Sequence, residues 1–295
     1  MTSTAAQRSG GGQPQGPCAE SQGPCGQPHG GRAQPQGPCG QRHDRRGQRH
    51  GRRVQPQGRI RCGAVFLDAG GVIVLPDRDL VAGALAGVGV AIDRSLVPAA
   101  HYRAVRRLDA RPDPSGAPDP YGRAFCAALG VPDARLPDAL RALGELAERS
   151  RSGEVLWSEQ APNALRTIVA LRRAGTQVLV VTNSDGHAHE NLRDAGICQA
   201  GAGPGAAVND VIDSGVVGSA KPDPAIFRAA LGRAGVPPEL VVHVGDTVCA
   251  DVVGARAAGI TPLHLDPHRA CRAADHRHVR SLAGIWRHVE PLPAR

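Results

Sequence analysis

From residue 63 to about residue 266 the chain alternates short apolar segments with amphipathic ones, and this alternation restricts the fold more than any other feature. The segments GAVFL (63–67), QVLVVT (177–182) and LVVHVG (240–245) are short and rich in Val and Leu, which is typical of buried strands. Segments with helical periodicity, bounded by Gly or Pro, separate them. The pattern predicts an α/β fold with a three-layer, Rossmann-like parallel sheet, whose ligand site lies at the carboxyl ends of the strands.

Further elements follow from the same periodicity. Helices are expected over about 187–195 and 249–258, and a helix with Pro222 in its first turn is expected to run to Gly235. Further strands are expected over about 208–212 and 261–265, the second being the last strand of the chain.

Three regions differ in composition. Residues 1–60 consist largely of Gln, Gly, Pro and Arg, with QPQGPC repeated, and are predicted to form a disordered tail. Residues 77–157 contain amphipathic pieces broken by Pro and Gly, which suit a small domain of four short helices. Residues 61–76 and 158–290 are expected to form the α/β core domain, so that the helical domain is an insertion after the first strand.

The net charge of +8 lies in the tail, because the first 62 residues hold ten arginines and two acidic residues. The remainder is neutral and offers no general footprint for polyanions, so any nucleic-acid binding is expected from the tail alone. No segment is long and apolar enough for a membrane span, and the N-terminus has no apolar leader, so we expect a cytoplasmic protein. The eight scattered cysteines are expected to be reduced thiols.

Polar residues follow several of the predicted strands. These residues are Asp68, Thr182, Lys221, Asp246 and Asp251. Lys221 is the only lysine among 35 basic residues, which suggests a position that requires a compact ammonium group instead of a guanidinium group. Because the carboxyl ends of parallel strands meet at one edge of the sheet, these side chains are expected to lie together.

In this order the segments VFLDAGGV (65–72), VVTN (180–183), AKPDP (220–224) and VGDTVCAD (244–251) resemble the four motifs of the haloacid dehalogenase superfamily. The resemblance spans about residues 63–266 and includes a helical cap domain after the first motif. It implies a magnesium-dependent phosphatase that acts on a small phosphorylated metabolite.

The resemblance also implies roles for individual residues. Asp68 is expected to attack phosphorus and form an aspartyl-phosphate, and Lys221, the Thr182 hydroxyl and the Asn183 backbone N–H are expected to hold the transferring oxygens. Gly71 is expected to contact the substrate. Mg²⁺ is expected to bind Asp68, the backbone carbonyl of Gly70 and Asp246, with Asp251 supporting that shell or anchoring Lys221.

The sequence departs from this pattern at Gly70, where phosphatases of the superfamily usually carry a second Asp as general acid and base. This departure keeps two alternatives open: a binding module without turnover, and a metal-independent 2-haloacid dehalogenase, against which the acidic fourth motif argues. Turnover of a phenyl phosphate ester with Mg²⁺ separates the enzyme from the module. A dinucleotide-binding domain is excluded, because the first turn has no GxGxxG motif. The particular substrate and the oligomeric state are not determined by the sequence.

Other chemically reactive residues receive structural interpretations. Four groups are involved: the tail residues Cys18, Cys25, Cys39, His29 and His43, the helix residues His101, Tyr102, Arg103, Arg106 and Arg107, the C-terminal residues His264, His268, His276 and His278, and the two tryptophans Trp157 and Trp286. Neither the tail group nor the C-terminal histidines show metal-ligand spacing, and the latter are expected on the surface. The helix residues could contact a leaving group, but a solvated face is expected there. The tryptophans are expected to pack.

Overall fold

The structure is a computed structural model that describes residues 58–110, 118–149 and 155–292. The predicted tail and its cysteines lie outside these residues, apart from the last residues before the core. Within the described residues, no helix combines the length and the apolar character needed to cross a membrane.

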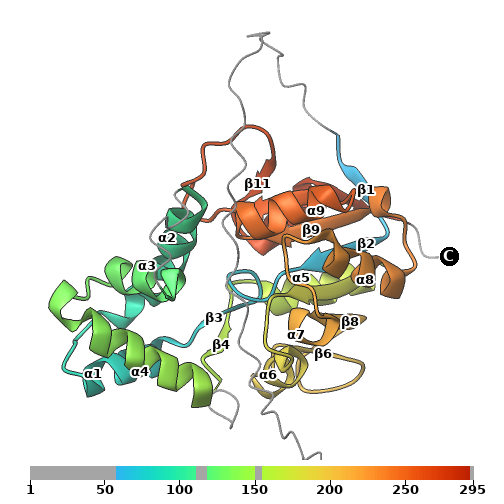
Figure 1. Ribbon diagram of the computed structural model, residues 1–295. Coiled ribbons are helices and arrows are strands. Elements are labelled where there is room, and N and C mark those ends of the chain that lie inside the picture. The colour runs from blue at the N-terminus through green and yellow to red at the C-terminus, as the bar shows by residue number, and fades with distance from the viewer. Residues whose placement is uncertain (1–57, 111–117, 150–154, 293–295) are drawn as a thin grey trace, which may run out of the picture. The chain divides into compact units, whose positions relative to one another are not determined.

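A six-stranded parallel sheet lies at the centre of the core (Figure 1). Its order is β11-β10-β9-β2-β5-β8, and every neighbouring pair is parallel. The strands are β2 (Ala64–Leu67), β5 (Gln177–Thr182), β8 (Asp210–Asp213), β9 (Val241–Gly245), β10 (Thr261–Leu265) and β11 (Arg277–Val279). The predicted α/β fold with a parallel sheet is therefore confirmed.

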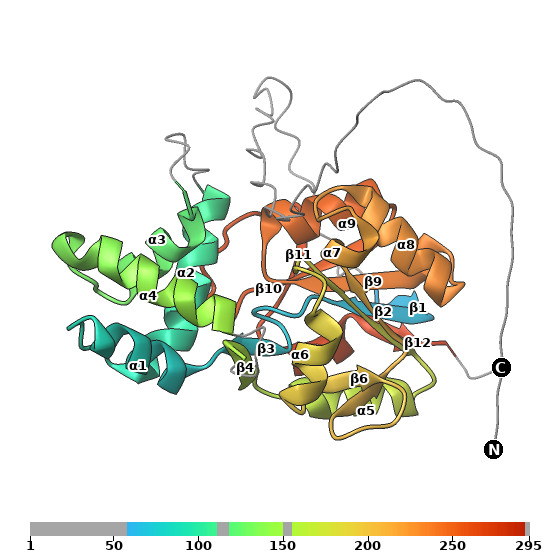
Figure 2. The ribbon, with the colours of Figure 1, turned by 60° about the horizontal axis from the view of Figure 1, so that its bottom comes forward.

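Alternate residues of the central strands point to opposite faces of the sheet, as the strand period of two requires. Val65, Leu67 and Val244 belong to one apolar cluster, and Ala64 and Phe66 belong to another. On the first face pack α5 (Ala164–Arg173) and the 3₁₀-helix η6 (Leu282–Arg287), and on the second pack α8 (Pro224–Ala234) and α9 (Val253–Ala257) (Figure 2). Because both faces are covered, the central strands β2, β5 and β9 are mostly apolar.

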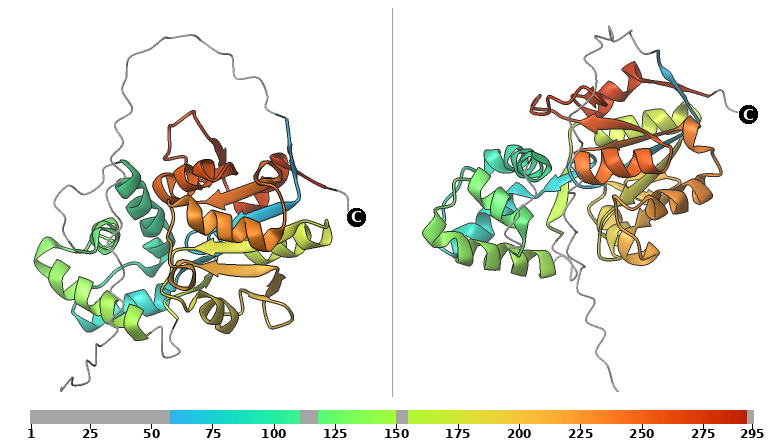
Figure 3. Two further views of the ribbon diagram at one scale, coloured as in Figure 1. Left: turned by 45° about the vertical axis from the view of Figure 1, so that its right-hand side comes forward. Right: turned by 45° about the horizontal axis from the view of Figure 1, so that its top comes forward.

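A helical insertion separates the first strand of the sheet from the second. The antiparallel strands β3 (Val74–Pro76) and β4 (Trp157–Gln160) enclose it in the chain. Its helices are α1 (Arg78–Gly87), α2 (Val97–Ala110), α3 (Pro120–Ala128) and α4 (Leu136–Arg149). The four helices form a group of their own (Figure 3). They share an apolar cluster built around residues such as Leu85, Phe125 and Ala139.

The remaining strands and α-helices lie around the sheet. They are β1 (Ile60–Cys62), which pairs with β12 (Val289–Pro291), β6 (Cys198–Ala200), which pairs with β7 (Ala206–Val208), and the helices α6 (Ala188–Asp194) and α7 (Ser214–Val217). Strands of three residues in Gly-rich or polar surroundings carry too little periodicity to be found in the sequence.

Two predicted boundaries are wrong. The strand over 261–265 is not the last, because β11 and β12 follow it. Pro222 is not in the first turn of a helix, since α8 begins at Pro224 and the side chain of Asp223 caps it by accepting from Ala225 N. Pro224 takes the N-terminal position that suits proline, and Lys221 and Pro222 are left in the preceding loop.

The close approach of α9 to the loop before α8 gives a stability prediction. A Cβ on Gly254 would lie 2.8 Å from Phe227 and 3.0 Å from two backbone atoms of Pro222, so Gly254→Ala should lower the free energy of unfolding by about 1–3 kcal/mol. Gly232→Ala is the control, because that helical position is exposed with no neighbour within 4 Å, and it should stabilise by about 0.5–1 kcal/mol. Urea denaturation of both variants measures the difference, and equal effects would contradict this packing.

Candidate active site

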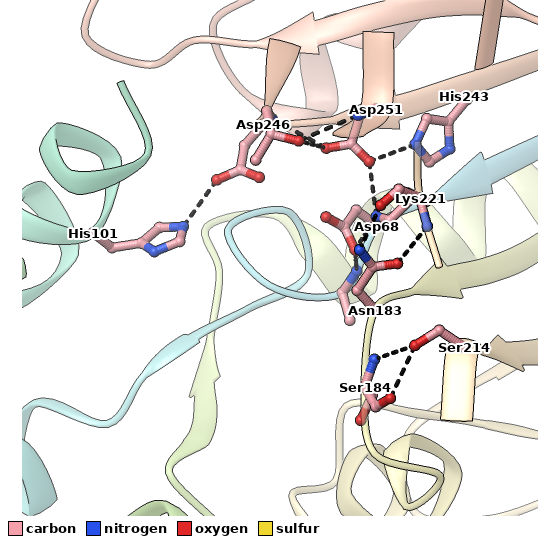
Figure 4. A network of polar contacts seen from close by, with 11 residues as sticks. Asp68, His101, Asn183, Ser184, Ser214, Lys221, His243, Asp246 and Asp251 are labelled. Carbon is pink, nitrogen blue, oxygen red and sulfur yellow. Dashed lines mark hydrogen bonds and ion pairs between the residues drawn. The ribbon is translucent and has the colours of Figure 1, made fainter. Parts of the chain in front are cut away.

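Three loops at the carboxyl edge of the sheet bring four charged side chains together (Figure 4). Asp68 follows β2 and Asp246 follows β9, and these strands are neighbours in the sheet. Asp251 lies in the short π-helix η5 (Val248–Val252), and Lys221 lies in the loop before α8. These four charged residues are nearly buried, with exposed fractions of 8%, 4%, 1% and 2%, respectively. Ionised groups at such positions require partners.

Lys221 joins two of the carboxylates. Its Nζ lies 2.8 Å from Oδ1 of Asp68 and 2.7 Å from Oδ1 of Asp251. Burial opposes the charged amine, but the two carboxylates outweigh it and hold the pKa of Lys221 above its ordinary value. The ammonium group is therefore fixed beside Asp68, where only its compact head could approach both carboxylates.

Asp251 is bound on both oxygens. Its Oδ1 also accepts from Nε2 of the buried His243 at 2.9 Å, and its Oδ2 accepts from N and Oγ1 of Thr247. Burial would raise the pKa of Asp251, but the Lys221 ammonium and the hydrogen bond from His243 hold it well below its usual range. Asp251 is thus an ionised anchor for Lys221.

The negative charge of Asp68 is offset by fewer partners than that of Asp251. Its Oδ1 accepts from Ala69 N at 2.7 Å and from Lys221. Burial, followed by the repulsion of Asp251 and Asp246, raises the pKa of the Asp68 carboxyl to about 7 although Lys221 opposes the rise. The carboxylate therefore lies in a buried site with excess negative charge.

The donor set suits a hard divalent cation. Carboxylate oxygens of Asp68, Asp246 and Asp251 lie within 4.8 Å of one another, and all three residues are buried. One ammonium group contacts two of these three carboxylates, Asp68 and Asp251, so a cation would relieve the remaining negative charge. Mg²⁺ prefers oxygen ligands and commonly binds one or two carboxylates with waters. The chemistry of the site thus fits the magnesium ion that the sequence predicts.

The helical insertion reaches this site through α2. His101 Nε2 lies 2.9 Å from Oδ2 of Asp246, its Nδ1 lies 2.9 Å from the hydroxyl of Tyr121, and Tyr102 donates to the carbonyl of Gly71 at 2.7 Å. The solvated face expected for this helix is therefore wrong for His101, which is 3% exposed. The helix expected around 101–107 is confirmed as α2. The contact of His101 with Asp246 depends on how α2 packs against the edge of the sheet, which helical periodicity does not specify.

Gly71 permits this contact. Its φ is +73°, and a Cβ would lie 2.1 Å from Oδ2 of Asp246 and 2.5 Å from Nε2 of His101. Any side chain would therefore collide with the pair, in addition to the strain of a left-handed backbone. Glycine at 71 is required by packing, whatever its part in substrate binding.

The position that lacks the second Asp is covered by an aromatic ring. A Cβ on Gly70 would meet Cζ3 of Trp157 at 3.3 Å. Trp157 begins β4 and makes an edge contact with His101, with ring centroids 5.3 Å apart. The indole is a packing residue, as expected from the sequence. It packs against the turn at Gly70, where related phosphatases usually carry the second Asp.

The loop after β5 is held by side chains that the sequence reasoning did not connect. Asn183 donates through Nδ2 to the carbonyl of Lys221 at 3.0 Å and accepts the Lys221 N–H at 2.8 Å, so it fixes the backbone of the lysine. Asp213 accepts from Gly186 N and Ala188 N. Thr182 ends β5 and is 5% exposed. Asp213 lies opposite Thr182 in the sheet, a pairing visible only once the strand register is known.

A cavity of about 500 Å³ lies beside Asp246, lined by both α2 and the core, whereas Asp68 and Lys221 are not among its lining residues. The insertion contributes residues such as Tyr102, Arg103 and Arg106, and the core contributes Asp246, Asp266 and Cys271. Asp109 closes one side by accepting from Val248 N and Cys249 N at 2.9 and 3.0 Å, and burial raises its pKa to about 6. A small ligand in this cavity would contact arginines of α2, as the sequence allowed.

Comparison with known proteins agrees with this geometry. The model of the family described as haloacid dehalogenase-like hydrolase matches residues 62–259. Haloacid dehalogenase-like hydrolase domain-containing protein 3 of Mus musculus is 34% identical over 131 residues, covering 44% of this chain and 48% of that protein. Phosphoserine phosphatase of Thermus thermophilus is 36% identical over 131 residues, with the same coverage. The magnesium-bound HAD-hydrolase YfnB of Bacillus subtilis aligns with a TM-score of 0.52 and 19% identity, covering 77% of this chain and 97% of that chain.

The chain thus combines a parallel sheet with Asp68 after its first strand, the buried Lys221, and the acidic loop that holds Asp246 and Asp251. One family model matches the greater part of this chain. The chain belongs to the haloacid dehalogenase-like hydrolase family. It spans about half the length of the curated relatives that it matches. The likeness to YfnB concerns the fold alone.

The buried ion network gives a second stability prediction. Lys221→Met leaves Asp68 and Asp251 buried without their ammonium partner, which should lower the free energy of unfolding by about 3–5 kcal/mol at pH 8. An unpaired buried carboxyl has a raised pKa, so the folded variant binds more protons than the unfolded chain, and its stability should recover as the pH falls toward 5.

The control is Arg228→Met on the exposed face of α8, which should change the stability by less than about 0.5 kcal/mol. Chemical denaturation at both pH values measures the effect. A loss for Lys221→Met that does not depend on pH would contradict the ionised network.

Proposed function

We propose that this chain is a magnesium-dependent phosphohydrolase that acts on a small phosphomonoester through an aspartyl-phosphate on Asp68. The observation that carries the proposal is the fixed position of Lys221 between Asp68 and Asp251, next to Asp246. A carboxylate can attack a phosphate dianion only where positive charge offsets their repulsion. The family membership and the relative named phosphoserine phosphatase support the same reading.

Asp68, Asp246 and the carbonyl of Gly70 would hold the magnesium ion, with Asp251 in support. When bound, the ion supplies positive charge that stabilises the phosphate oxygens. Every oxygen of Asp251 already accepts a hydrogen bond or faces Lys221, so its main part is to hold the lysine.

The protein's own groups would position the substrate. Oδ1 of Asp68 is fixed by Ala69 N and Lys221, which aims the carboxylate at phosphorus. Lys221 neutralises a transferring oxygen, while the Thr182 hydroxyl and the Asn183 N–H donate to the others. The arginines of α2 that line the cavity, Arg103 and Arg106, suit an anionic leaving group. The substrate class is therefore a small acidic phosphomonoester.

Gly70 determines which step is slow. Without an acid at 70, leaving groups that need a proton depart slowly, and without a base there the water that hydrolyses the aspartyl-phosphate is not activated. Each loss is typically worth about 10²- to 10⁴-fold in rate. A phenolic leaving group needs no proton, so the aspartyl-phosphate should form quickly and be hydrolysed slowly. Accumulation of the phosphoenzyme distinguishes this account from an ordinary phosphatase of the family.

The kinetic test uses p-nitrophenyl phosphate, the full chain and Mg²⁺. We expect a burst of p-nitrophenolate equal to the concentration of enzyme, followed by turnover at least about 10²-fold slower. Asp68→Asn should abolish the burst, and removal of Mg²⁺ by chelation should do the same. Asp194→Asn, on the exposed face of α6, is the matched control and should leave the burst intact.

Other outcomes would assign other functions. A folded protein that binds phosphate but gives neither burst nor turnover would be the binding module. Release of halide from a 2-haloacid without metal would be the dehalogenase. A burst that persists in Asp68→Asn would remove Asp68 from the mechanism.

A further inference from the structure

Four potential metal ligands meet at the end of the sheet, apart from the carboxylates. Ligand atoms of His264, Cys271, His276 and His278 all lie within 4.8 Å of one another. His264 lies on β10, His278 lies opposite it on β11, and Cys271 and His276 lie on the segment between these strands. The expected surface position is wrong for His264, which is 4% exposed, and is confirmed for His268, which is exposed. Pairing of β10 with β11 closes the intervening loop and gathers side chains whose spacing fits no familiar pattern.

Hydrogen bonds at the rim of the cluster determine which ring nitrogens carry hydrogen. His264 Nε2 lies 3.1 Å from the carbonyl of Asp246, and His276 Nδ1 lies 2.8 Å from Oδ1 of Asp275. Both partners can only accept, so these outer nitrogens are the N–H donors. In the neutral rings, Nδ1 of His264 and Nε2 of His276 therefore carry lone pairs, and the outer contacts direct both lone pairs into the cluster.

In the neutral rings the two inner nitrogens face one another without a hydrogen between them, and the Cys271 thiol is a weak donor beside them. His264 Nδ1 lies 3.1 Å from His276 Nε2, and Cys271 Sγ lies 3.7 Å from the same nitrogen. Among the described residues, the buried Nε2 of His278 has no hydrogen-bond partner. Two lone pairs at 3.1 Å repel unless a cation or a proton lies between them. The cluster therefore has the polarity of a cation site, with its lone pairs turned inward.

We propose that His264, Cys271, His276 and His278 form a zinc site. Imidazole nitrogen and thiolate sulfur are both ligands that Zn²⁺ favours, and it binds nitrogen at about 2.0–2.1 Å and sulfur at about 2.3 Å. A tetrahedron with these bonds separates two nitrogens by about 3.3 Å and nitrogen from sulfur by about 3.6 Å. The observed separations of 3.1 and 3.7 Å are close to both.

The surroundings of the cluster are those of a structural zinc site. Asp275 accepts from His276 and also from Nη1 of Arg256 at 2.9 Å, which is the carboxylate–histidine arrangement that orients zinc ligands. Four protein ligands would complete the coordination and leave no position for a substrate, so the ion would stabilise the fold and take no part in hydrolysis.

The zinc ion would fix one wall of the active site. Cys271 and Ala270 line the cavity, and Arg106 of α2 donates to the carbonyl of Ala270 at 3.0 Å. His264 at the same time holds the backbone of Asp246. Zinc binding would therefore order the loop that receives α2 and position the backbone of a magnesium ligand.

Cobalt binding provides the test, because a Co²⁺–thiolate bond gives a charge-transfer band in the near ultraviolet that carboxylates do not produce. The protein is the full chain with Cys18, Cys25 and Cys39 replaced by Ser, titrated with Co²⁺ in excess Mg²⁺. We expect one equivalent of Co²⁺ with a tetrahedral visible spectrum and the thiolate band, both displaced by Zn²⁺. Zn²⁺ should also raise the thermal midpoint.

Variants connect the signal to these residues. Cys271→Ser should abolish the thiolate band, and His278→Gln should weaken Co²⁺ binding at least about 10-fold. Asp275→Asn changes an exposed carboxylate that need not disturb folding, and it should weaken Zn²⁺ binding by about 10- to 100-fold. Cys249→Ser and His189→Gln are the matched controls and should retain full binding.

Three results would overturn the proposal: no thiolate band in the parent, a band that survives Cys271→Ser, or Zn²⁺ affinity that is unchanged in Asp275→Asn. None of these three readouts requires phosphatase activity. Failure of the zinc site is therefore distinguishable from failure of the proposed function.

Discussion

The ammonium group of Lys221, held between Asp68 and Asp251, is the interaction on which the site depends. Removing three carboxylates and an amine from water is costly, and the cost is offset only where each charge has a partner. Asp251 secures the lysine with help from His243 and Thr247, and Asn183 fixes the lysine backbone. The loops after β2, β5 and β9 are thereby tied to one another at the edge of the sheet.

Much of this could be predicted from the sequence, because a parallel sheet turns linear order into spatial order. Apolar runs located β2, β5 and β9, and the polar residues after them had to meet at one edge. The single lysine in an arginine-rich chain indicated a position with a geometric requirement. Gly70 likewise identified the missing acid, although only the structure places the Trp157 ring against that turn.

The contacts that the sequence could not predict join segments that lie far apart in the chain. His101 meets Asp246 because α2 packs over the edge of the sheet, and helical periodicity specifies a face but not its neighbour. The histidines of the cluster at 264–278 meet because β11 pairs with β10, and a three-residue strand leaves almost no periodic signal. Both contacts touch Asp246, one through its side chain and the other through its carbonyl, so the insertion and the C-terminal loop converge on a single candidate magnesium ligand.

The claim that Asp68 is a nucleophile whose phosphorylated form accumulates is tested most directly by reductive trapping. The protein is mixed with p-nitrophenyl phosphate and Mg²⁺, quenched, and treated with borohydride, which reduces an aspartyl-phosphate to homoserine. Mass spectrometry of the peptide that contains residues 65–72 then reads the modification. We expect homoserine at position 68 in most of the protein, dependent on Mg²⁺ and absent in Asp68→Asn. An unmodified Asp68 under conditions of measurable turnover, or a trapped phosphoryl group at another residue, would contradict it.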